Sequence, residues 1–129
     1  MTLPTDAAEV WAAMIDTTNP MPIAMAIDLL MEITNCERPQ AVSQLHIAAG
    51  EWLEKQCWTT VGFPISQTVE ESDVGKACAS IKRLQLTEAR KHTEYLEYVA
   101  KEYAVDGYTQ WSNHRNHCLS LLEQVQALH

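Results

Sequence analysis

The chain has 129 residues, 47% of them hydrophobic, and a formal net charge of −8 at pH 7. A chain of this length removes roughly two-thirds of its unfolded surface from water, which is enough for one hydrophobic core without metals or disulfides. We therefore expect a single domain over residues 1–129. The low content of glycine (4 residues) and proline (5 residues) disfavours a chain made mainly of loops and tight hairpins.

Neither export nor membrane insertion is indicated by the sequence. Residues 1–6 contain no basic segment leading into a long apolar stretch, so we predict no signal peptide. The most apolar run, residues 23–31, is interrupted by Asp28, whereas a membrane-spanning helix needs about 20 apolar residues. We therefore expect a cytoplasmic protein whose cysteines are reduced: Cys36, Cys57, Cys78 and Cys118.

The charge is distributed unevenly along the chain. Residues 1–75 contain eleven carboxylates and two cationic side chains, whereas residues 76–129 contain six carboxylates and seven cationic side chains. Direct nucleic-acid binding is disfavoured, because neutralising a phosphate backbone needs many lysines and arginines. The acidic first half would instead attract a basic surface of another protein. The simpler interpretation of the same acidity is a solubilising surface.

Helical periodicity with recognisable starts and stops predicts six helices and an all-α bundle. The first helix begins at Asp6, where Glu9 three residues later completes a capping box. The second helix, residues 20–34, follows a capping Asn19 and is apolar on nearly all sides. We therefore expect this second helix to be the most buried one in the molecule.

The third helix is predicted over residues 39–56, with His46 at the edge of its apolar stripe. Glu51 and Glu54 lie opposite the stripe, so we expect both carboxylates on the exposed side. An extended loop is predicted at about residues 58–67, because a β-branched and aromatic segment without a partner strand cannot form a sheet. This loop contains Phe63, the only phenylalanine, which is a candidate docking side chain unless the loop folds onto the core.

Three further helices are predicted over residues 68–85, 88–105 and 108–128. Thr68 and Glu71 form a capping box for the fourth helix, and Thr87 caps the fifth. Asp106 and Gly107 are predicted to form the turn of an antiparallel hairpin between the fifth and sixth helices. The sixth helix has an apolar seam with alternating steps of three and four residues, which is typical of bundle packing: Trp111, His114, Cys118, Leu121, Val125 and Leu128.

One cluster of potential metal ligands follows from this hairpin. At about 1.5 Å of rise per residue, His117 and Cys118 fall within roughly 3–5 Å of His92 along the helix axis. Imidazole and thiolate are ligands that zinc and similar ions prefer, and Glu88, one turn before His92, is a fourth candidate. The simpler interpretation is that the histidines lie at the boundary of the bundle and that Cys118 belongs to the core.

The sequence contains no glycine-rich phosphate loop, no Gly-x-Ser-x-Gly elbow and no His-Glu-x-x-His motif. Tyrosines crowd the predicted hairpin, and half-exposed aromatic side chains are usual anchors at protein interfaces. We therefore expect a non-enzymatic, cofactor-free, acidic protein-binding module, an adaptor or inhibitor, whose partner has a basic surface. Its expected binding residues are Glu51, Glu54, Phe63, Tyr95 and Tyr98.

Two alternatives remain open at the level of sequence. The first is a metal-binding helical bundle, including the case of an enzyme, in which His92, His117 and Cys118 hold zinc or a similar ion. The second is a structural homo-oligomer in which the seam of the sixth helix pairs with its own copy.

Overall fold

The computed structural model of the chain describes residues 3–60, 73–94, 98 and 106–128. These residues form helices and no strand, which confirms the predicted all-α class. The helices are α1 (Ala7–Ile15), α2 (Ile23–Thr34), α3 (Arg38–Thr60), α5 (Asp73–Lys82), α6 (Leu86–Lys91) and α8 (Asp106–Ala127). None of the helices in the described ranges has the length and apolar character needed to cross a membrane.

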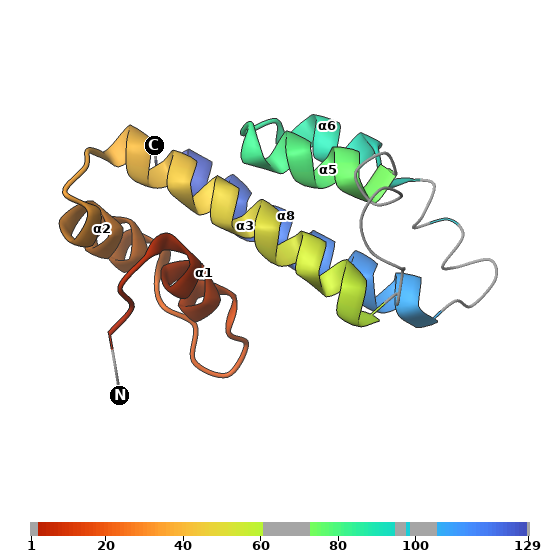
Figure 1. Cartoon of the computed structure of the whole chain (residues 1–129), viewed down its shortest axis with the longest axis horizontal. Coiled ribbons are helices and arrows are strands. Elements are labelled where there is room, and N and C mark those ends of the chain that lie inside the picture. The colour runs from red at the N-terminus through yellow and green to blue at the C-terminus, as the bar shows by residue number, and fades with distance from the viewer. Residues whose placement is uncertain (1–2, 61–72, 95–97, 99–105, 129) are drawn as a thin grey trace.

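Helix α3 lies at the centre of the bundle. Figure 1 shows α1 and α2 on one side of α3, α5 and α6 on the other, and α8 running alongside α3. Helices α3 and α8 are antiparallel, because Arg38 donates a hydrogen bond to the Leu128 carbonyl (3.1 Å) at one end and the Trp111 indole donates to the Leu53 carbonyl (3.2 Å) further along. The core therefore forms where four helices pack around α3.

The start of α2 differs from the prediction. The helix begins at Ile23, with Pro22 at the N-cap position and no side-chain cap, so Asn19 is not its cap and Pro20 lies outside it. The reason is steric: a residue directly before a proline is pushed out of the helical region, and Met21 precedes Pro22. The α2 helix therefore cannot begin before Pro22.

The prediction that this second helix is the most buried one is also wrong. Ala26, Ile27 and Leu30 are buried, but Met25 is 57% exposed and Ile33 is 36% exposed. Helix α2 packs mainly on α3 and α1 at one edge of the bundle, so only one of its apolar faces is covered. The central position belongs to α3, whose buried side chains include several small ones.

Helix α3 is longer than predicted. It continues to Thr60, so residues 58–60 of the predicted loop are helical, and residues 61–67 lie outside the described residues. Tryptophan and threonine are less favourable in a helix than alanine by only about 0.7 kcal/mol or less each. A helix that is already fixed by packing against α5 and α8 can extend through such residues.

His46 is fully buried and does not lie at the edge of the core. Its Nδ1 lies 2.8 Å from the Val42 carbonyl and its Nε2 lies 3.1 Å from the Gln126 side-chain nitrogen. The imidazole therefore donates to the carbonyl through Nδ1 and accepts from the amide through Nε2. The same Gln126 nitrogen donates to the Leu84 carbonyl (3.2 Å), so one amide connects α3, α8 and the turn before α6.

That turn explains why α6 begins at Leu86 and Thr87 is not its cap. Leu84 has a left-handed backbone (φ 64°), and the Gln85 N–H donates to the Ser80 carbonyl (2.9 Å) in a Schellman arrangement. The chain reverses there and enters α6 directly. Helix α6 ends at Lys91, earlier than the predicted fifth helix.

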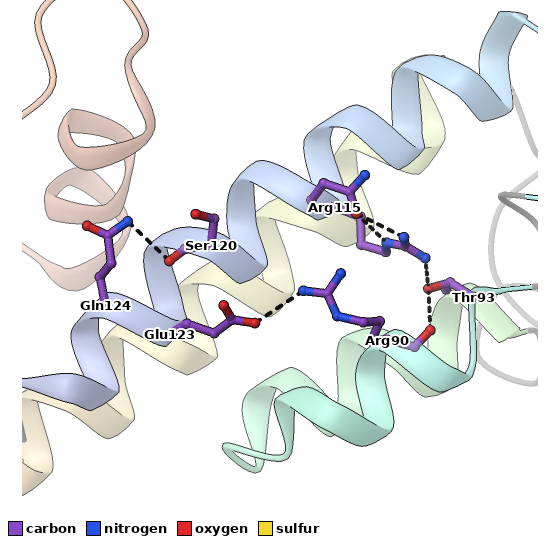
Figure 2. A network of polar contacts seen from close by, with 7 residues as sticks. Arg90, Thr93, Arg115, Ser120, Glu123 and Gln124 are labelled. Atoms are coloured by element: carbon purple, nitrogen blue, oxygen red, sulfur yellow. Dashed lines mark hydrogen bonds and ion pairs between the residues drawn. The ribbon is translucent and has the colours of Figure 1, made fainter.

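The predicted hairpin turn at Asp106 and Gly107 is wrong, because both residues lie in the first turn of α8. The predicted antiparallel pairing nevertheless holds between α6 and α8. Arg90 pairs with Glu123 (3.1 Å), and Thr93, just after α6, accepts a hydrogen bond from Arg115 (Figure 2).

The buried face of α8 is rotated from the predicted seam. Trp111, Cys118 and Val125 are fully buried as expected, but His114 and Leu121 are only partly buried and Leu128 is exposed. Their places are taken by Arg115 and Leu122, which are buried. A sequence pattern treats arginine as a polar residue, whereas here hydrogen bonds to Thr93 and Asn116 allow the guanidinium to be buried.

Gly50 marks a close approach between α3 and α5. A Cβ at this position would lie 2.7 Å from Lys82 Cγ and 2.9 Å from the Cys78 carbonyl oxygen. The Gly50→Ala variant should therefore lose about 1–3 kcal/mol of stability through overpacking, although alanine is the better helix former. Thermal unfolding tests this expectation, and Lys82→Ala in the same background should restore only part of the loss. A variant more stable than the parent would show that α5 moves away without cost.

Leu30 is one of three fully buried residues of α2, with Ala26 and Ile27, that pack into the core. Leu30→Asp should remove several kcal/mol from the free energy of unfolding, out of a total of about 5–15 kcal/mol for a typical domain, because the buried carboxylate has no partner. Ile33→Asp, on the partly exposed side of the same helix, is the matched control and should cost far less. Equal melting temperatures for the two variants would contradict this packing.

Candidate functional site

The predicted metal ligands are not brought together. His117 is exposed and the adjacent Cys118 is fully buried, because consecutive residues on a helix point in different directions. His92 is half-buried at the C-cap of α6. Among the residues that the structure describes, no three His, Cys, Asp or Glu side chains are grouped so that they could hold a metal ion.

Cys118 has the environment of a core residue. Burial, and to a lesser degree the neighbouring Cys78 thiol, raises the pKa of Cys118 far above its usual value. The side chain is therefore a neutral thiol at physiological pH. Cys118 belongs to the hydrophobic core, as the simpler interpretation of the sequence has it.

His114 belongs to an aromatic cluster that the sequence pattern does not reveal. Its ring packs edge-on against Trp52 (5.5 Å between centroids), and Trp52 in turn packs edge-on against Trp11 (6.2 Å). Burial, and then the nearby His117, lowers the pKa of His114. The imidazole is therefore neutral at physiological pH and joins α1, α3 and α8 through packing.

The predicted protein-binding residues lie in different environments. Glu51 is exposed as expected, but Glu54 is half-buried and its carboxylate lies 3.4 Å from Lys82 Nζ of α5. The expectation that Glu54 lies on an exposed side is therefore wrong, because α5 packs beside that part of α3. Tyr98 is 59% exposed. Phe63 and Tyr95 lie outside the described residues.

The structure contains a groove that the sequence did not indicate. It has a volume of about 660 Å³ and lies between residues 3–4, one face of α1 and residues 16–25. Eight of its eleven lining residues are apolar, among them Leu3, which is 72% exposed, and Met25. We call this feature the α1–α2 groove.

Local contacts position the walls of the groove. The Asp6 side chain accepts from the Glu9 N–H (2.9 Å), as the predicted capping box requires, whereas the Glu9 carboxylate accepts from the Thr5 N–H (2.9 Å) rather than from Asp6. At the other end of α1, the Met21 N–H donates to the Ala13 carbonyl (2.9 Å). These bonds hold the segments before and after α1 against the helix.

The rim of the groove is negative. Glu9 and Asp16 line it, one near each end of α1. The Thr18 hydroxyl (2.7 Å) and then the Thr18 N–H (2.8 Å) donate to Asp16, which lowers the pKa of this carboxyl. Asp16 therefore remains ionised to lower pH than an ordinary aspartate.

Residues 3–37, which we call the acidic unit, carry no lysine, arginine or histidine but six carboxylates: Asp6, Glu9, Asp16, Asp28, Glu32 and Glu37. Arg38 of α3 pairs with Asp28 (3.7 Å), and this is the one ion pair of the acidic unit within the described part of the chain. By contrast, Lys82, Arg90 and Lys91 each pair with a carboxylate. The positive charges of the second half are thus partly neutralised internally, whereas all six carboxylates of the acidic unit belong to exposed residues.

The reactivity of the thiols offers a direct check of the environment of Cys118. Iodoacetamide at neutral pH should modify Cys36, which is half-buried, while Cys118 stays unmodified in the folded protein and reacts only after denaturation. Mass spectrometry of the cysteine-containing peptides measures both. Rapid modification of native Cys118, or its protection only when zinc is added, would contradict the assignment of this thiol to the core.

The groove and the acidic unit together combine exposed apolar surface with negative charge. The groove offers apolar contact area and two carboxylates, which suits binding of an apolar group with positive charge beside it. Comparison of the chain with models of protein families, with curated proteins and with solved structures found no match.

Proposed function

We propose that this chain is a non-enzymatic protein-binding module, an adaptor or inhibitor, that docks a basic surface of another protein on its acidic unit. The observation that carries the proposal is the combination of six carboxylates, no cationic side chain and an exposed apolar groove within residues 3–37. Large apolar side chains exposed beside charged ones are typical of docking sites in soluble proteins.

The electrostatic part of this function acts before contact. Carboxylates of one sign create a potential that attracts an opposite charge and raises the association rate, and salt screens it beyond about 8–10 Å. The apolar part acts after contact, because removing Leu3 and Met25 from water stabilises the bound state and slows dissociation. An adaptor or inhibitor needs both properties and no catalytic group.

The proposed surface differs from the one predicted from sequence. Glu54 is a weaker candidate because Lys82 already pairs with it, while Glu51 and Tyr98 are exposed but lie outside the acidic unit, so the proposal does not depend on them. The homo-oligomer hypothesis loses its predicted seam, because Trp111, Cys118 and Val125 are buried within one chain. Within the residues that the structure describes, no observation favours that hypothesis or the metal-binding one.

The test is affinity capture from an extract of the native host, followed by binding kinetics with the captured protein at two ionic strengths. The variant Glu9→Gln, Asp16→Asn, Glu32→Gln removes three charges of the acidic unit but keeps a hydrogen-bond acceptor at each position. We expect it to lower the association rate constant about tenfold, the lower end of the range for electrostatic steering. It should also flatten the dependence of that rate on salt.

The matched control removes three charges elsewhere, through Glu51→Gln, Glu88→Gln and Glu94→Gln, all of which are exposed. It should leave the association rate nearly unchanged, since the net charge falls equally but the acidic unit is intact. If the control slows association and the first variant does not, the docking surface lies outside the acidic unit, on α3 or on the segment around α6. Capture that is insensitive to both variants and to salt would refute the proposal.

A further inference from the structure

The α1–α2 groove has a specific chemical pattern on its helical wall. Glu9, Ala12 and Ala13 of α1 and its C-cap residue Asp16 line the groove. They follow the spacing i, i+3, i+4, i+7, so they form one stripe along the helix. The stripe lies opposite the residues that α1 buries. Two alanines therefore form a shallow apolar floor, with one carboxylate beyond each end.

The positions of Glu9 and Asp16 along the helix axis set the size of what can bind between them. Seven residues of helix correspond to about 10 Å along the axis. An extended peptide covers that distance in about three residues, at roughly 3.3 Å per residue. Two cationic side chains about three positions apart can thus reach Glu9 and Asp16 together, with one large side chain between them.

The groove is formed before any ligand arrives. Pro4, Pro20 and Pro22 contribute to its walls, and proline fixes the backbone angle φ. The hydrogen bond from Met21 to Ala13 and the turn at Asp16 hold the wall opposite α1. Met21 and Met25 are the adaptable part of the lining, because a methionine side chain adjusts to different apolar shapes. A volume of about 660 Å³ lies within the usual range of about 300–1,000 Å³ for ligand pockets.

We infer that the α1–α2 groove binds a basic peptide segment, seating one large aliphatic or aromatic side chain on Ala12 and Ala13 between cations that face Glu9 and Asp16. The inference rests on the proposed function and names the part of the partner that enters the groove. Anionic ligands are repelled by the rim, and a second copy of this chain would bring its own net charge of −8. Charge complementarity therefore selects a basic segment.

The methionines allow a direct test on the full chain. The probes are short synthetic peptides in which two lysines, three positions apart, bracket a leucine, a phenylalanine or a tryptophan. With the methionine methyl groups labelled with ¹³C, we expect the NMR signals of Met21 and Met25 to shift on titration. The Met14 and Met31 signals are internal controls, because these side chains do not line the groove and Met14 is buried in the core.

Matched variants distinguish the contribution of the groove's shape to peptide binding from the contribution of its charge. Ala12→Leu should fill the floor and weaken peptide binding at least about tenfold, whereas Ala24→Leu, an exposed position of α2 outside the groove, should leave affinity unchanged. Glu9→Gln with Asp16→Asn should also weaken binding about tenfold and reduce its salt dependence. The control that removes two charges outside the acidic unit, Glu51→Gln with Glu88→Gln, should not.

Several outcomes would overturn the inference while leaving the proposed function standing. A peptide with serine in place of the central apolar residue that binds equally well would show that only charge is recognised. Shifts at Met31 without shifts at Met21 and Met25 would place the peptide elsewhere, and no shift with any probe would refute a groove for basic segments. Groove signals that move with protein concentration alone would show that a second copy is the occupant. Conversely, groove binding without any effect of the acidic unit on capture of the partner would refute the function and not the groove.

Discussion

The close packing of α3 against its neighbours is the constraint on which the rest of the structure depends. Four helices contact α3, and the approach of α5 is only possible because Gly50 has no side chain where Cys78 and Lys82 pass. Buried alanines on the same helix keep other approaches short: Ala41, Ala48 and Ala49. Because α3 is covered by α5 and α8 along much of its length, α1 and α2 are left at one edge with a face of their own in solvent. The exposed α1–α2 groove thus follows from the packing of α5 and α8 on the central helix α3.

The same packing explains which parts of the fold could be predicted. The helical class and the Asp6 cap depend on local pattern and local hydrogen bonds, which a sequence states directly. Whether α2 is more buried than the other helices could not be predicted from its composition, because burial depends on which helix has neighbours on all sides. His46 was misplaced, and the burial of Arg115 was not predicted, for a related reason. A polar residue can occupy the core once its partners are supplied by segments far away in the sequence, here Gln126 and Thr93. The start of α2, by contrast, follows from Pro22 and could have been predicted.

For the candidate site, the acidity of the first half was visible in the sequence, but the groove was not. It requires residues 16–25 to fold back against α1, and the bond from Met21 to Ala13 that secures this return has no signature in the sequence. The ion pairs of Lys82 and Arg90 were equally invisible, because their partners lie 28 and 33 residues away. Charge counts therefore located the acidic half correctly, whereas only the structure distinguishes charges that are already neutralised from charges that remain available for a partner.

The side chain of Gln126 has a consequence for how this bundle opens. Its amide nitrogen bonds both His46 inside α3 and the carbonyl of Leu84, whose left-handed backbone is unfavourable by about 1–2 kcal/mol for a residue other than glycine. Helix ends normally fray first, because the last turn makes few stabilising contacts. Here, unwinding the last turn of α8 would leave a buried imidazole without one hydrogen-bond partner and release a strained reversal 42 residues earlier in the chain. The end of α8 is thereby coupled to the cooperative unit of the core. We therefore expect this helix end to open together with the core and not by separate fraying.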